Sequence, residues 1–236
     1  MSKEDYLPRY RYPKTIIRFA VCQNMFHSAR DVAIIVFFTF KVIVSHKTIC
    51  EWTKKFIRNI EIPVIEYGDE TLICHADEKY VKINGEWHFW WSIKDCFGNL
   101  IHKIITPSRD FESAKRFFKE ARRKINRDVD ILVRDGLAAY DRATKFLGRK
   151  CKSFVAGIKG NPLIFNKEFY WLTNNPVESL NSEIDFYLGK FRNNFASLES
   201  ANRFADIFML RKRLKKLFAE KKLSEASSLL RQAIII

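Results

Sequence analysis

The chain has 236 residues, of which 47% are hydrophobic, which is enough to bury a core and too many for a globally disordered protein. Lys and Arg outnumber Asp and Glu by 42 to 27, so the formal net charge is +15 at pH 7. Such a surface favours polyanionic partners, most often nucleic acid and sometimes an anionic membrane. A general bias of the source towards lysine is the alternative explanation of the charge.

Other classes of protein are disfavoured. The longest largely apolar run, residues 32–40, falls well short of the roughly 20 residues that a membrane span needs. The N-terminus carries charges and prolines where a signal peptide has an apolar segment, so we expect a cytoplasmic protein without membrane attachment. The five cysteines and five histidines lack the spacing of a structural zinc site, and an odd number of cysteines gives no disulfide framework.

Residues 14–60 predict a unit of three helices, because apolar residues recur there at helical spacing. Ser28 and Ser45 precede the second and third helices as N-caps. In the third helix, residues 45–60, the apolar side chains would face the core at Ile49, Trp52 and Phe56.

The opposite face of that third helix would be exposed and basic, which suits DNA phosphates and groove edges. We therefore predict a helix-turn-helix DNA-binding domain over residues 1–60. Its candidate DNA contacts are His46, Lys47, Lys54 and Lys55. A solvated helix face without a role in nucleic-acid binding is the alternative.

The pattern changes after residues 61–70, which contain Pro63 and Gly68 and predict a linker. Residues 71–83 are strand-like, and the dipeptide Asn84-Gly85 suits a type I′ hairpin turn into an aromatic second strand. The following elements are a strand at 100–106, a helix at 109–126, a strand at 129–133, a helix at 137–147, a strand at 153–155 and a helix from Pro176.

This order, β-β-β-α-β-α-β-α, is that of the ribonuclease H-like fold, in which helices flank a mixed five-stranded sheet on both faces. We assign the α/β catalytic domain to residues 71–195. A C-terminal helical region would then occupy residues 196–236.

Three carboxylates stand where a strand ends or a helix begins. Asp77 lies on the first strand, Asp135 follows the fourth, and Glu178 lies near the start of a later helix. In this fold the first and fourth strands are parallel neighbours, so Asp77 and Asp135 would approach each other. Carboxylates gathered in a basic protein need a cation, and oxygen-only ligands select Mg²⁺ or Mn²⁺ over zinc. Two such ions suit phosphodiester chemistry on nucleic acid.

Other polar and aromatic residues near these acids receive structural roles. We expect Glu78 to be a sheet-face partner, because its side chain should point away from that of Asp77 on a strand. Asp95 fits ordinary turn chemistry. The aromatic cluster is expected to be sheet core and cover rather than a base-stacking platform; its members are Trp87, Phe89, Trp90 and Trp91.

The acids stand in three sequence blocks, HADEKYVKINGEWHFWWSIKD, VRDGLAAY and TNNPVESLNSEI. These blocks resemble the three catalytic blocks of DDE transposases, most closely those of the insertion-sequence-six family. The helix-turn-helix ahead of them and the total length are also similar to that family. The resemblance implies that Asp77, Asp135 and Glu178 are the catalytic residues and the ligands of two Mg²⁺ or Mn²⁺ ions.

One departure concerns the third acid. The interval between Asp135 and Glu178 is longer than is usual for the family, and residues 157–171 would contain the extra residues as a loop or hairpin. Glu183 is the alternative third ligand. Lys190 and Arg192 resemble positions near DNA in the family, although a solvated basic face explains them equally well.

The resemblance implies a DNA transposase that binds terminal inverted repeats and target DNA, cleaves strands and transfers them. It also implies a homodimer, because two DNA ends must be brought together. Helices over residues 210–236 would supply either the dimer interface or core packing within the monomer. Two alternative functions are a ribonuclease H-like nuclease without strand joining and a non-catalytic DNA-binding remnant of a transposase.

Overall fold

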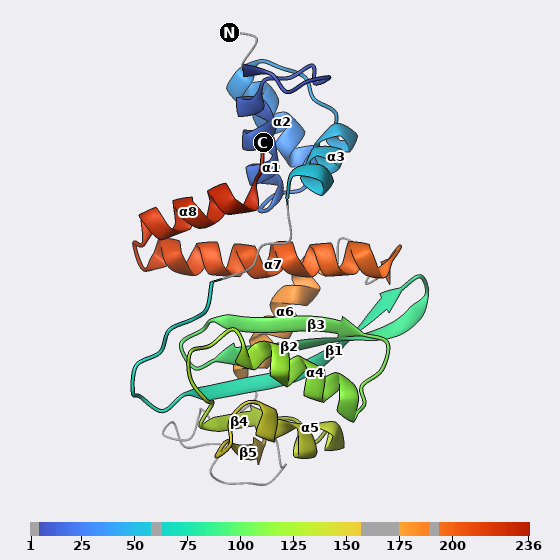
Figure 1. Cartoon of the computed structure of the whole chain (residues 1–236). Coiled ribbons are helices and arrows are strands. Elements are labelled where there is room, and N and C mark those ends of the chain that lie inside the picture. Colours follow the sequence, from blue (N-terminus) through green and yellow to red (C-terminus); the bar gives the residue numbers. More distant parts are fainter. Residues whose placement is uncertain (1–4, 58–62, 157–174, 189–193) are drawn as a thin grey trace. The chain divides into compact units, whose positions relative to one another are not determined.

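The computed structural model describes residues 5–57, 63–156, 175–188 and 194–236 (Figure 1). The chain forms two compact units, of which the first combines residues 1–61 with 206–236 and the second comprises residues 62–205. The end of the chain, which we expected to form a region of its own from residue 196, therefore folds largely with the N-terminal helices.

The first unit contains the three N-terminal helices that the sequence predicts: α1 (Lys14–Asn24), α2 (Ala29–Phe40) and α3 (His46–Phe56). Both predicted N-caps are present. The Ser28 hydroxyl accepts a hydrogen bond from the Asp31 amide, and the Ser45 hydroxyl accepts one from the Thr48 amide. These caps satisfy amides that would otherwise lack a partner at the first turn of each helix.

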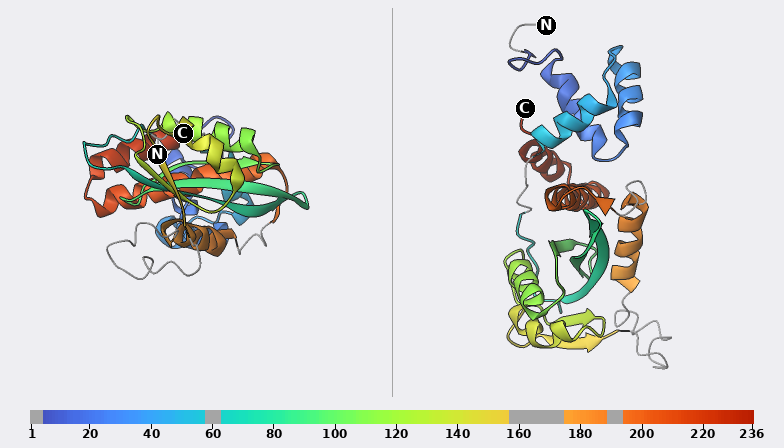
Figure 2. Two further views of the ribbon diagram at one scale, coloured as in Figure 1. Left: turned by 90° about the horizontal axis from the view of Figure 1, so that it is seen from below. Right: turned by 90° about the vertical axis from the view of Figure 1, so that its right-hand side faces the viewer.

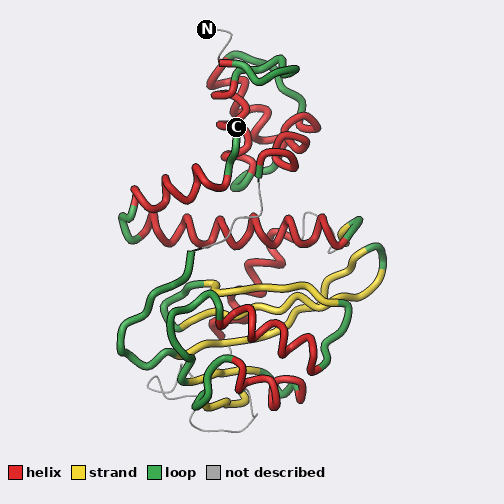
Figure 3. Tube along the Cα trace, viewed as in Figure 1, coloured by secondary structure: helices red, strands yellow, loops and turns green. Residues whose placement is uncertain are grey.

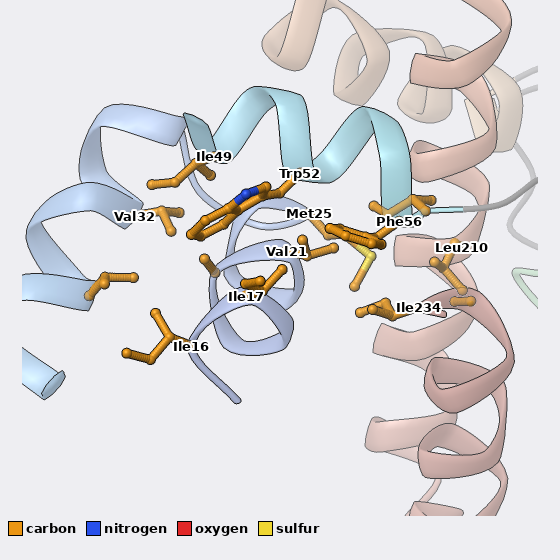
Figure 4. Close-up of a cluster of buried hydrophobic side chains, with 14 of the residues drawn as sticks. Ile16, Ile17, Val21, Met25, Val32, Ile49, Trp52, Phe56, Leu210 and Ile234 are labelled. Atoms are coloured by element: carbon orange, nitrogen blue, oxygen red, sulfur yellow. The ribbon is translucent and has the colours of Figure 1, made fainter. Parts of the chain in front are cut away.

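A single hydrophobic core joins these helices to the end of the chain (Figure 4). Ile49, Trp52 and Phe56 of α3 are buried in it, as predicted from their spacing. The C-terminal part of α7 (Leu198–Ala219) contributes Leu210, and the chain after α8 (Leu223–Ala233) contributes Ile234. The C-terminal helices thus serve as core within the monomer, one of the two roles that we expected for them.

The second unit is built on a mixed sheet. Its strands are β1 (Ile73–Ile83), β2 (Glu86–Asp95), β3 (Leu100–Thr106), β4 (Ile131–Arg134), β5 (Lys152–Val155) and the short β6 (Asn194–Phe195). The order is β3-β2-β1-β4-β5, in which β1, β4 and β5 are parallel and β2 is antiparallel to both of its neighbours. β6, which the sequence does not reveal, pairs with the end of β1.

Helices cover both faces of this sheet (Figure 2). On one face lie α4 (Phe111–Arg122), α5 (Ala138–Ala143) and the 3₁₀ turn Thr144–Phe146; α6 (Asn175–Leu188) lies on the other. Strand order, direction and helix placement confirm the predicted ribonuclease H-like fold. No described helix combines the length with the apolar character that a membrane span requires.

The pleat of β1 separates two sets of side chains. Glu78 lies opposite Trp91 of β2, which contacts Phe117 of α4 and Tyr140 of α5. Lys79, the next residue, points to the other face and pairs with Asp185 of α6. Even-numbered positions of β1 therefore face α4 and α5, and odd-numbered positions face α6.

The β1–β2 hairpin extends past β3, β4 and β5 (Figure 3), and the short β6 pairs with the end of its first strand. Its turn is formed by Asn84 and Gly85, with φ angles of 51° and 85°, the two positive values that a type I′ turn requires. The pairing of β2 with β3 ends at Phe89 and Thr106, so the last residues of the hairpin have no strand of β3 beside them.

The core of the first unit can be tested at Trp52, which is 4% exposed. We expect Trp52→Ala to lower the free energy of unfolding by about 3–5 kcal/mol, because it removes a large buried side chain and leaves a cavity. Urea unfolding followed by circular dichroism measures this loss. Lys54→Ala, on the exposed face of the same helix, is the control and should change stability by less than about 0.5 kcal/mol. Equal stability of the two variants would contradict the packing of α3.

Candidate functional site

The site lies where the parallel ladder between β1 and β4 ends. The last pair of this ladder is Ala76 with Arg134, so Asp77 and Asp135 follow it side by side. The next parallel neighbour of β1 among the described residues is β6, which begins to pair at Lys82. The sequence prediction that Asp77 and Asp135 approach each other is thereby matched in the structure.

Three carboxylates form the centre of the site. One oxygen from each of Asp77, Glu78 and Asp135 can be chosen so that all three lie within 4.8 Å of one another. The expectation that Glu78 is only a sheet-face partner is too narrow. Its side chain does start on the α4 face, but β4 no longer flanks β1 at this height, and the carboxylate reaches the group formed by the two aspartates.

Hydrogen bonds orient the two aspartates. Asp77 accepts one from its neighbouring amide at Glu78, at 3.0 Å, and one from the Asn181 side-chain amide, at 2.7 Å. Asp135 accepts one from the Leu137 amide, at 3.0 Å, in the turn that leads into α5. Both side chains are therefore held in place by groups that donate to the ionised form.

The Asp135 turn is fixed by a buried arginine. Arg134 is 5% exposed and donates to the Asp135 carbonyl at 2.8 Å and to the Ser153 hydroxyl of β5, also at 2.8 Å. Its guanidinium also pairs with Asp141 of α5. A side chain with this many fixed partners positions the backbone from which the Asp135 carboxylate projects.

Glu78 is held from two sides. The Tyr140 hydroxyl donates to its Oε2 atom at 2.9 Å, and Arg109 donates to its Oε1 atom at 3.1 Å. Tyr140 is fully buried and Glu78 is 8% exposed. A buried carboxylate with both oxygens satisfied is geometrically fixed, which is the property required of a metal ligand or of a residue that positions one.

The electrostatics of the group favour a bound cation. Burial, and after it the charge of Asp135, raises the pKa of Asp77 to about 6 and that of Glu78 to about 7. Clustered acids in a partly buried place resist ionising together. A divalent cation removes this conflict, and an all-oxygen set of donors suits a hard ion. Asp77, Glu78 and Asp135 thus could hold a metal.

Glu178 lies on α6, beside this group. Its charge is one cause of the raised pKa of Asp77, but its side chain is exposed and stands outside the set of three close oxygens. Asn181, which is bonded to Asp77, follows it by three residues and therefore shares its face of the helix. Glu183 is five residues after Glu178, which turns its side chain well away from that face.

Two further contacts fix α6 against the sheet. Lys79 of β1 forms an ion pair with Asp185 at 2.7 Å, and Lys94 of β2 donates to the Pro176 carbonyl at 3.4 Å. The apolar side of the helix is buried at Val177, Leu180 and Ile184. The helix segment that carries Glu178 is thus anchored on both polar and apolar sides.

The predicted DNA contacts are placed as follows. His46, Lys47, Lys54 and Lys55 are exposed on α3, and the Lys55 ammonium lies 5.0 Å from the centre of the Tyr10 ring. Lys190 and Arg192 lie outside the described residues.

Sequence reasoning missed Asn181 and the full environment of Glu78. A signal for Asn181 was present, because a polar residue three positions after Glu178 on a helix shares its face. Arg109 lies far from the acidic residues in sequence and carried no signal of its own.

Comparison with known proteins gives one match to a protein family. Residues 72–217, well over half of the chain, match the family of DDE domains of IS240-type transposases. No curated protein sequence is significantly similar. Among solved structures, the simian T-cell lymphotropic virus intasome in complex with PP2A regulatory subunit B56 gamma is similar over 75% of this chain and 64% of that chain, with 12% identity and a TM-score of 0.44.

The raised pKa values of Asp77 and Glu78 predict a dependence of stability on pH and metal. In the unfolded chain Asp77 and Glu78 ionise near their ordinary pKa values of 3.8 and 4.5, which is at lower pH than in the folded chain. Their contribution to folding stability is therefore complete below about pH 4 and is lost as the pH rises to about 7. In metal-free buffer, Asp77→Asn should become more stable relative to the wild type over this window, by on the order of 1–2 kcal/mol.

Thermal unfolding at several pH values, with EDTA and with Mn²⁺, measures this difference. Mn²⁺ should raise the melting temperature of the wild type more at pH 8 than at pH 5, and should have little effect on Asp77→Asn. Asp69→Asn removes an exposed carboxylate outside the site and serves as the matched control. If the stability of the wild type and that of Asp77→Asn responded equally to pH and Mn²⁺, the carboxylate group would not be the origin of the pH dependence.

Proposed function

Because the chain belongs to the DDE transposase family, we propose that it cleaves and joins DNA strands at the ends of an insertion sequence. Asp77, Asp135 and Glu178 are the proposed catalytic residues. The observation that supports this most directly is the carboxylate group at the end of the β1–β4 ladder, with α6 holding Glu178 beside it. The formal net charge of the whole chain, +15 at pH 7, suits a polyanionic substrate.

The proposed cofactors are two Mg²⁺ or Mn²⁺ ions, held by Asp77, Asp135 and Glu178. When bound, such ions activate a water or a DNA 3′-hydroxyl and stabilise the leaving oxygen of an in-line displacement. Glu78 lies close enough to the aspartates to take part in ligation or to hold the group in position.

The other residues of the site have positioning roles. Asn181 orients the Asp77 carboxylate, Arg134 fixes the backbone of Asp135, and Tyr140 with Arg109 restrains Glu78. These restraints are formed before any substrate arrives, so little reorganisation is needed when charge develops on the reacting phosphate.

Recognition of the terminal inverted repeats is assigned to the helical unit, through the exposed face of α3. The buried face of this helix is fixed by Trp52 and Phe56, which leaves His46, Lys47 and Lys54 directed away from the core. Target DNA would also be bound by basic surface. A homodimer is the simplest assembly that holds two DNA ends together, and the exposed side chains of Phe218 and Leu223 remain available to it.

The competing functions share parts of this site. A nuclease without transposition would use the same acids but would not join strands, so a strand-transfer assay separates it from a transposase. A non-catalytic DNA-binding remnant would bind inverted repeats equally well without metal. The ordered hydrogen bonds around Asp77, Asp135 and Glu78 favour a working catalytic centre over a remnant.

The catalytic assignment is tested with DNA that carries the inverted repeats flanking the coding region. We expect Asp77→Asn, Asp135→Asn and Glu178→Gln each to reduce Mn²⁺-dependent nicking and strand transfer by at least about 100-fold, because each removes a carboxylate that would hold the metal ions. Glu183→Gln is the matched control on the same helix and should keep activity within about threefold of the wild type. Retained activity in either aspartate variant would reject the assignment. A loss in Glu183→Gln instead of Glu178→Gln would move the third ligand to Glu183.

The role of α3 is tested by the salt dependence of DNA binding. Each phosphate contact contributes about one unit to the slope of log K against log salt. The double variant Lys47→Ala, Lys54→Ala should therefore reduce the slope by about two. Lys222→Ala, outside α3, is the control and should leave the slope unchanged. An unaltered slope in the double variant would show that this face of α3 does not contact DNA.

A further inference from the structure

The β1–β2 hairpin carries an aromatic surface that the metal centre does not use. Tyr80 lies opposite Phe89 and Lys82 lies opposite Trp87, so all four side chains share one face of the hairpin, the face of Glu78. Arg109 lies over the rings of Tyr80 and Phe89. We name these five residues the aromatic platform.

The platform is exposed where an ordinary aromatic core would be covered. Trp87 is 56% exposed and Tyr80 is 49% exposed, whereas Trp90 and Trp91, which follow in the same strand, are fully buried. The run of aromatic residues therefore divides into two parts with different environments. Trp90 and Trp91 are buried, as expected of sheet core, and Phe89 packs against the core that contains Trp91, whereas Trp87 is exposed.

The rings are held in a fixed arrangement by their neighbours. The centres of the Tyr80 and Phe89 rings are 5.0 Å apart, and those of Tyr80 and Trp87 are 6.0 Å apart, both with edge-to-face geometry. The type I′ turn at Asn84-Gly85 fixes the register of the two strands. Exposed rings that are already ordered lose little conformational freedom when a flat ligand stacks on them.

Two cations flank these rings. The Lys82 ammonium lies 4.7 Å from the centre of the Trp87 ring, and the Arg109 guanidinium carbon lies 5.6 Å from that of Tyr80 and 5.8 Å from that of Phe89. Aromatic rings beside positive charges match the two parts of a nucleotide, because the base stacks and the phosphate pairs with the cation. These two positive charges attract a DNA strand and repel a basic partner.

The platform is continuous with the acidic site. Arg109 donates to Glu78 at 3.1 Å while it covers the platform rings. From Glu78 through Tyr80 to Lys82 the strand extends roughly 13 Å, at about 3.3 Å per residue. This is about the length of four stacked nucleotides at 3.4 Å each. A DNA strand that has a phosphate at the acids can therefore run along the hairpin.

We propose that the aromatic platform stacks against unpaired bases of the DNA strand whose phosphodiester lies at the acidic site. This proposal rests on the proposed function, since it takes DNA as the substrate. The alternative is that the rings only stabilise the hairpin as cross-strand pairs. Such pairs require no base and would not distinguish one kind of DNA end from another.

The experiment compares two DNA probes in EDTA, where no strand is cut. Both are fluorescein-labelled duplexes of mixed sequence with a short single-stranded tail, and one has abasic sites in place of the tail nucleotides. Fluorescence anisotropy measures their affinities. The wild type should bind the tail with bases roughly tenfold more tightly, because stacking is lost with the bases while the phosphates remain.

The double variant Tyr80→Leu, Trp87→Leu should lose this preference and should bind the abasic probe about as tightly as the wild type does. Trp87→Phe keeps a flat ring and should retain most of the preference. Phe38→Leu removes an exposed aromatic side chain of the helical unit and should leave the preference intact. Thermal unfolding verifies that each variant is folded. If the double variant is not, the single variant Trp87→Leu replaces it and should lose most of the preference.

The outcomes separate the two proposals when Mn²⁺-dependent nicking is assayed on the same preparations. If the wild type nicks DNA but binds both probes equally, the stacking role of the aromatic platform is rejected and the proposed catalytic function is retained. Base-dependent binding that requires Trp87 but occurs without nicking supports the platform and overturns catalysis. A protein that neither nicks DNA nor distinguishes the probes overturns both.

Discussion

The site depends on the point at which β4 leaves β1. As long as two parallel strands pair, their side chains alternate between the faces of the sheet, and neighbouring residues of one strand cannot meet. The ladder ends at Ala76 and Arg134, immediately before two aspartates, and this ending lets three carboxylates from both faces converge. Their mutual repulsion opposes the arrangement, so packing on both sides must hold it. Trp91, Phe117 and Tyr140 do so on one face, and Val177 and Ile184 on the other.

Much of this arrangement could be predicted from the sequence, because the signals for it are local. Strand periodicity, the Asn84-Gly85 turn and the serine caps depend on neighbouring residues, and all appear in the structure. The fold then brings Asp77 and Asp135 together through strand order alone. The membership of Glu78 in the acidic group could not be predicted, since alternation along a strand indicates the opposite face. Only the position of the last β1–β4 pair overrides that rule.

Contacts between distant parts of the sequence account for the other omissions. Leucines at helical spacing near the end of the chain have the same pattern whether they pack within one chain or between two, and the structure places Leu210 and Leu229 in the core of the helical unit. The exposure of Trp87 depends on where β3 ends, which cannot be read from the aromatic run itself. Arg109 joins the platform to the acids because the chain before α4 passes over the sheet.

The place of Glu178 is set by other side chains on the same helix. Glu178, Asn181 and Asp185 recur at intervals of three and four residues, so they lie along one face of α6. Asn181 is bonded to Asp77, and Asp185 is paired with Lys79, two residues further along β1. These two contacts fix both the rotation of the helix and its position along the strand. A shift of one residue would rotate each side chain by roughly 100° and break both contacts. The position of Glu178, on the helix face that carries Asn181, is therefore fixed by these two neighbours.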